Sequence, residues 1–104
     1  MDRDRFHNLL ALNLGRNRTV EEKRFTVRIE EGVNEESPRF VIEQPDYRQI
    51  ACFYASDMPD KVWSECITKE GRFTIEALGI EQDIKDFIKA VYVAYEKANE
   101  KNFL

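Results

Sequence analysis

The chain has 104 residues, the size of one domain, and we expect residues 1–104 to fold as a single α+β unit. Apolar residues make up 42% and aromatic residues 12% of it, a globular composition that excludes wholesale disorder. The net charge of −4 and the pI near 5.1 argue against a nucleic-acid binder that relies on overall basic charge. No apolar run approaches the roughly 18 residues that span a membrane, so we expect no membrane segment.

The first predicted element is a short helix at the N-terminus. Asp2 or Asp4 can cap it, because an aspartate oxygen accepts hydrogen bonds from the unpaired N–H groups of a first turn. Apolar side chains then recur at spacings of three and four residues: Phe6, Leu9, Leu10 and Leu14. Gly15 follows where a helix usually ends, so the pattern predicts a helix that stops near this residue.

After Lys23, apolar residues alternate with polar residues instead of recurring at helical spacing, and this change predicts strands. Phe25, Val27 and Ile29 alternate with polar residues, as in a strand with one buried face. A second short strand is predicted over 39–43. The stretch 50–55 is apolar at nearly every position, which indicates burial on both faces, so we expect this strand at the centre of the sheet.

Two further strands are predicted over 62–68 and 72–78, on either side of Lys69-Glu70-Gly71. A turn with Gly71 in the left-handed conformation would join them as a tight hairpin. In that register four large apolar side chains share one face: Trp63, Ile67, Phe73 and Ile75. The short connections favour antiparallel neighbours, since a parallel crossover needs a dozen or more residues.

The clearest predicted element is a long C-terminal helix over about 81–100. Apolar residues recur along it at spacings of three and four, with acidic residues in its first turn and lysines in its last turns, which complements the helix dipole. Glu81 precedes Lys85 by four residues, the favourable order for an ion pair. The sequence therefore predicts an α+β fold with a short N-terminal helix, a five-stranded, mainly antiparallel meander sheet and a long C-terminal helix packed on one face.

No pattern in the chain matches a catalytic, metal-binding or phosphate-binding motif, so we expect neither an enzyme nor a cofactor. His7 is the only histidine, and no ligand or acid–base partner stands beside it. Cys52 and Cys66 lie in apolar stretches, whereas reactive thiols need electropositive, accessible sites. The residues after Met1 do not resemble a signal peptide, so we expect a cytoplasmic protein with two free thiols.

Positive charge is concentrated in the N-terminal part of the chain. Residues 1–28 hold seven basic and four acidic side chains, a net charge of +3, whereas the remaining residues have a net charge of −7. Four basic residues form the alternative candidate site, for a nucleic-acid-associated regulator: Arg16, Arg18, Lys23 and Arg24. Glu21 and Glu22 dilute this stretch, and no aromatic residue alternates with the arginines, so nucleic acid is the less favoured partner.

The middle of the chain holds a surplus of aromatic residues, and these are the candidate partner-binding residues: Tyr47, Phe53, Tyr54 and Trp63. Phe53 and Tyr54 are adjacent, so they must point to opposite faces of one strand, and only one can face the long helix. Tyrosine and tryptophan are enriched at interface hot spots. With no catalytic motif, these aromatic residues and the acidic body favour a small protein-binding module of the inhibitor, immunity-like, chaperone or adaptor kind, acting on a protein partner or as a homodimer.

Overall fold

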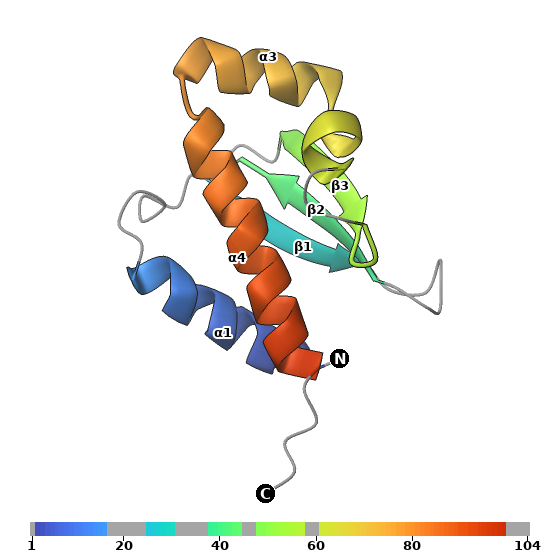
Figure 1. Cartoon of the computed structure of the whole chain (residues 1–104), viewed down its shortest axis with the longest axis vertical. Helices are drawn as coiled ribbons and strands as arrows, with labels where there is room; N and C mark the ends of the chain where they lie inside the picture. The colour runs from blue at the N-terminus through green and yellow to red at the C-terminus, as the bar shows by residue number, and fades with distance from the viewer. Residues whose placement is uncertain (1, 17–24, 31–37, 45–47, 58–60, 100–104) are drawn as a thin grey trace, which may run out of the picture.

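The computed structural model describes residues 2–16, 25–30, 38–44, 48–57 and 61–99. It contains an α+β arrangement in which two helices cover one face of a small antiparallel sheet (Figure 1). The element order is α1 (Arg3–Arg16), β1 (Thr26–Glu30), β2 (Arg39–Glu43), β3 (Gln49–Tyr54), a π-helical segment η2 (Val62–Cys66), α3 (Lys69–Leu78) and α4 (Glu81–Asn99). No described helix is both long and apolar enough to cross a membrane.

The described sheet has three strands in the order β1-β2-β3, and both pairings are antiparallel. The predicted strands at 25–30 and 39–43 are confirmed, and the one at 50–55 is displaced by a single residue. The prediction that this third strand is central was wrong, because β2 lies between the other two. The register shifts between Ile42 and Glu43, so that Ile50 forms a bulge opposite them.

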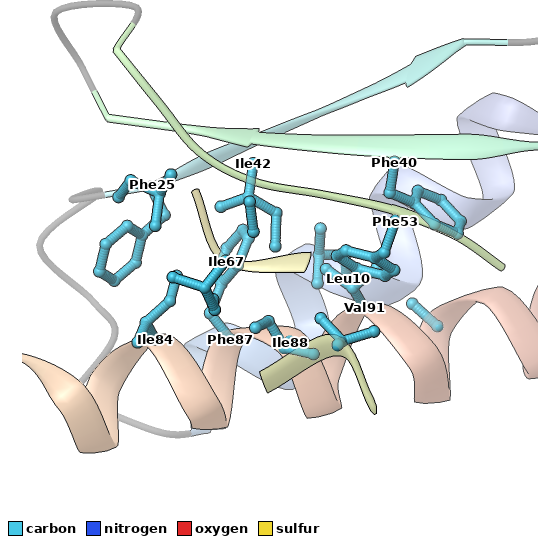
Figure 2. Close-up of a cluster of buried hydrophobic side chains, with 14 of the residues drawn as sticks. Leu10, Phe25, Phe40, Ile42, Phe53, Ile67, Ile84, Phe87, Ile88 and Val91 are labelled. Atoms are coloured by element: carbon cyan, nitrogen blue, oxygen red, sulfur yellow. The ribbon is translucent and has the colours of Figure 1, made fainter. Parts of the chain in front are cut away.

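The core lies between this sheet and the helices (Figure 2). From β1 and β2, Ile29 and Phe40 are paired and buried on this face, as the alternation predicts. The long helix faces them with buried side chains at helical spacing: Ile84, Phe87, Ile88 and Val91. The N-terminal helix begins where Asp2 Oδ1 accepts the Arg5 N–H at 3.1 Å, and its Phe6 ring stacks on Phe40 with ring centroids 5.5 Å apart. Both terminal helices are therefore confirmed, and so are their amphipathic faces, except that the side chain of Leu14 lies outside the described part of α1.

The opposite face of the sheet carries ion pairs between neighbouring strands. Arg28 Nε lies 3.1 Å from Glu43 Oε1, and Arg39 Nη2 lies 2.7 Å from Glu30 Oε1. The hydrogen bond from Arg39 lowers the pKa of Glu30. These cross-strand pairs place charged side chains on this face, although Val41, which pairs with Arg28, is buried there. In Figure 1 no described helix packs on this face.

The prediction of five strands was wrong, because 62–68 and 72–78 are not strands. Residues 62–66 form η2, whereas Ile67 and Thr68 keep an extended conformation, and Ile67 bridges Ala51. The helix α3 replaces the predicted hairpin. Thr68 caps it by accepting the Gly71 N–H at 2.8 Å, and Gly79 (φ 64°) closes it in the left-handed conformation.

Gly71, predicted as the turn residue of a hairpin, lies instead in the first turn of α3 and touches the bulge of β3. A Cβ atom at this position would lie 2.5 Å from the carbonyl oxygen of Ile50 and 2.8 Å from its Cα. Thr68 N–H also donates to that carbonyl at 2.8 Å. Because glycine has no side chain, α3 can lie in close contact with β3 at this position. This contact fixes the position of α3 relative to the sheet.

Candidate functional site

The helix α3 lies at one end of the molecule, beyond β3 and the N-terminal end of α4 (Figure 1). Its inner face is formed by Gly71 and Ile75, which are both buried. Phe73 lies on the opposite side of the helix, because two residues correspond to about 200° of rotation. Its side chain is 75% exposed, and Leu78 at the end of the helix is 61% exposed. These are the two most exposed large apolar residues in the described part of the chain, and both belong to α3.

Beside Phe73 lies an open groove of about 600 Å³, which we call the Phe73 groove. Among the described residues, four of α3 and the one that precedes β3 line it: Arg48, Lys69, Glu70, Phe73 and Thr74. Thr74 is held in the helix by a hydrogen bond from its hydroxyl to the Glu70 carbonyl at 3.1 Å. Grooves of this size accept side chains or a small ligand.

A second groove, of about 390 Å³, lies on the other flank of α3, and we call it the Trp63 groove. It is bounded by η2, α3 and the start of α4: Trp63, Ile67, Arg72, Ile75, Glu76 and Glu81. The ammonium of Lys85 lies 4.4 Å from the centre of the Trp63 ring and 3.3 Å from Glu81 Oε1. The chain thus places its own cation over this half-buried tryptophan.

A cluster of polar groups around Asp57 joins the end of β3 to η2 and α4. Asp57 Oδ2 accepts the Tyr54 N–H at 2.8 Å and lies 3.9 Å from Cys66 Sγ, while the Tyr92 hydroxyl donates to the Asp57 carbonyl. Burial raises the pKa of the Cys66 thiol, and the Asp57 charge raises it further. A neutral thiol is a weaker nucleophile than a thiolate. The contacts of Asp57 connect the end of β3 with η2 and α4.

The aromatic residues predicted to bind a partner do not form one patch. Phe53 is 1% exposed and stacks on Tyr92 of α4 with ring centroids 5.5 Å apart, so it is a core residue. Tyr54 points to the other face of the sheet and is half-buried. Trp63 lies in its own groove, and Tyr47 falls outside the described residues. Of the three that the structure describes, Trp63 lines a groove that α3 helps to form.

The alternative nucleic-acid site stays a prediction. Arg18, Lys23 and Arg24 lie outside the described residues, as does the side chain of Arg16, the last residue of α1. His7 is exposed and meets only the edge of the Phe6 ring among the described aromatic groups. Within the described ranges, no cluster of three or more histidine, cysteine, aspartate or glutamate side chains could hold a metal ion.

Comparison with known proteins identifies no relative. No protein-family model matches the chain, and neither the curated proteins nor the solved structures contain a significant match. The candidate site is therefore defined by its own geometry: the helix α3, with the Phe73 groove on one flank and the Trp63 groove on the other.

Phe73 is the site residue that the sequence analysis assigned to the wrong environment. Treated as part of a strand, it shares a buried face with Trp63 and Ile75. As part of a helix it is opposite Ile75 and is exposed. The spacing of Ile75 and Leu78, followed directly by Gly79, is the helical signal that could have found it.

Proposed function

We propose that this chain is a protein-binding module that docks a partner on α3, with Phe73 as the anchor and without catalytic activity. The observation that carries this proposal is an exposed phenylalanine beside an open groove. Burying such a side chain in an interface contributes about 1.5–3 kcal/mol. The same residue contributes almost nothing to the fold, because its ring lies outside the core cluster.

The neighbouring features extend the surface that a partner could cover. Leu78 and the Trp63 groove flank the same helix, and tryptophan is among the residues most often found at the energetic centre of interfaces. Trp63 and Phe73 together give α3 an aromatic group on each flank. The role belongs to the inhibitor, immunity-like, chaperone or adaptor kind that the sequence favours.

As part of the same proposal, we place this module in the cytoplasm. Cys52 and Cys66 are both free. Two free, partly accessible thiols are typical of a reducing compartment.

The test compares the wild-type chain with Phe73→Ser in quantitative affinity capture from cells that express the chain. Val93→Ser is the matched control, because Val93 is also an exposed apolar residue but lies on α4. We expect a stoichiometric protein partner whose recovery falls at least about tenfold with Phe73→Ser and is unchanged with Val93→Ser.

Thermal unfolding of the three proteins separates binding from folding, and Phe73→Ser should unfold within about 0.5 kcal/mol of the wild type. If no stoichiometric protein is recovered, or if recovery is equal for the wild type and Phe73→Ser, the proposal is wrong.

A further inference from the structure

We infer that the partner docked on α3 is a second copy of this chain, packed antiparallel about a two-fold axis that crosses the helix near Phe73. This inference rests on the proposed function and specifies its partner. It follows from the order of the exposed side chains along the outer side of α3.

One stripe on α3 contains Lys69, Phe73 and Glu76. Lys69 lies four residues before Phe73 and Glu76 lies three residues after it, and residues at these spacings share one face of a helix. All three side chains are exposed. The stripe therefore has an aromatic ring at its middle, a cation toward its N-terminal end and a carboxylate toward its C-terminal end.

This order of side chains is self-complementary. When two identical helices pack antiparallel about a two-fold axis, the residues before the crossing point face the residues after it on the other helix. A crossing near Phe73 sets Lys69 of each copy opposite Glu76 of the other. A parallel pair of helices would instead set lysine against lysine and glutamate against glutamate, so the charges favour the antiparallel arrangement.

The residues of the stripe are available for this contact. Within the described part of the chain, neither Lys69 nor Glu76 forms an ion pair. Ala77, also exposed and one turn after Phe73, has a small side chain, and small side chains at the contact let two helices approach closely. Because α3 lies at one end of the molecule, a second copy can approach it (Figure 1).

The Phe73 groove provides space for the aromatic ring of the second copy. The groove lies beside Phe73 on the same helix, so a two-fold axis that brings one ring to the partner's groove also brings the partner's ring to the groove of the first copy. Each copy thus supplies both a ring and a groove, and two exposed rings leave water together.

The contact is small, and this sets the expected strength of the dimer. A helix of ten residues is about 15 Å long. Interfaces below the standard size are weak and transient, so we expect a dissociation constant of about 10 µM to 1 mM.

The first experiment is sedimentation equilibrium of the full chain at concentrations from about 10 µM to 1 mM. We expect a monomer–dimer equilibrium. Phe73→Ser should weaken dimerisation at least about tenfold, because two rings are lost from one interface. Val93→Ser is the matched control, since it removes an exposed apolar side chain from α4, and it should leave dimerisation unchanged.

Charge reversal then tests the antiparallel register. Lys69→Glu sets two carboxylates against each other at both ends of the contact, and Glu76→Lys does the same with two ammonium groups. Each variant alone should dimerise about threefold to tenfold more weakly than the wild type. An equimolar mixture of the two variants pairs glutamate with lysine at both ends, so the mixed dimer should form as well as the wild-type dimer. Lys89→Glu makes the same change at an exposed position of α4 and should leave dimerisation unchanged.

Each contrary outcome has its own meaning. A wild-type chain that stays monomeric up to about 1 mM would overturn the second copy, whereas the proposed function would stand if Phe73→Ser still abolished the capture of a different protein. A dimer that Phe73→Ser does not weaken would lie elsewhere on the molecule and would also overturn the inference. If the mixture of the two charge variants associates no better than each variant alone, the antiparallel register is wrong.

Discussion

Tyr92 shows how a single side chain of α4 contacts both β3 and the turn that follows it. Its ring stacks on Phe53, and its hydroxyl donates to the carbonyl of Asp57. Burial raises the pKa of Tyr92, and the charge of Asp57 raises it further. The folded chain therefore favours the neutral phenol.

This environment predicts a pH-dependent effect of Tyr92→Phe. At neutral pH the variant should lose about 1 kcal/mol of unfolding free energy with its hydrogen bond. Because the folded-state pKa is raised above the unfolded value near 10, the stabilising contribution of the phenol is complete below this pH and is lost as the pH rises further. Urea unfolding at neutral and at alkaline pH should show the gap between wild type and variant closing, and a constant gap would contradict the assignment.

At the scale of elements, the sequence predicts well where one local pattern decides the structure. The alternation of Val27 and Ile29 with polar residues and the helical spacing along α4 each describe one buried face, and both elements form as predicted. Ion pairing of Glu81 with Lys85 also occurs as expected, at 3.3 Å. Trp63 was named from the sequence as a candidate partner-binding residue, but within a strand, and it lies instead in η2 beside the Trp63 groove.

The segment 62–78 could not be assigned in this way, because its residues fit two periods. Phe73 and Ile75 alternate as in a strand, whereas Ile75 and Leu78 are spaced as in a helix. The choice is made by tertiary contacts: Gly71 lies against the backbone of Ile50, and the Thr68 hydroxyl donates to the Gln49 carbonyl at 3.3 Å while it caps α3. These contacts join residues about twenty positions apart, which a local pattern cannot reveal. Because the segment is a helix and not the predicted hairpin, Phe73 lies on the surface.

The contact between α3 and β3 makes Gly71→Ala a strong test of this element. Alanine normally favours a helix over glycine by about 1 kcal/mol, yet here the added Cβ would lie 2.5 Å from a backbone oxygen that cannot easily move. We expect the overpacking to dominate and the unfolding free energy to fall by about 1–3 kcal/mol in urea denaturation. Thr74→Ala, at a half-buried position of the same helix, should stay within about 0.5 kcal/mol of wild type. A more stable Gly71→Ala protein would mean that α3 does not lie against Ile50.

At the scale of the whole molecule, one aromatic series joins the two ends of the chain. Phe6 of α1 stacks on Phe40 of β2, Phe40 packs on Phe53 of β3, and Phe53 stacks on Tyr92 of α4, with ring centroids 5.5–5.6 Å apart. All four rings belong to or pack against a single core cluster, which also includes residues of η2 and α3. A core shared in this way predicts that the helices and the sheet unfold together rather than in separate steps.

Phe6→Ala tests this cooperativity from the element that is farthest in sequence from Trp63. The buried ring should be worth about 3–5 kcal/mol, so the midpoint of unfolding should fall markedly. Trp63 is the only tryptophan, and it belongs to η2 and lies under Lys85 of α4, so its emission reports a region that Phe6 does not belong to. If the core is one unit, the transitions followed by Trp63 emission and by far-ultraviolet circular dichroism shift together, whereas Asn8→Ala, on the exposed side of α1, moves neither. If the circular dichroism transition shifts while the Trp63 transition does not, α1 unfolds independently of the rest. Only a shared core can make the removal of the Phe6 ring destabilise the surroundings of Trp63.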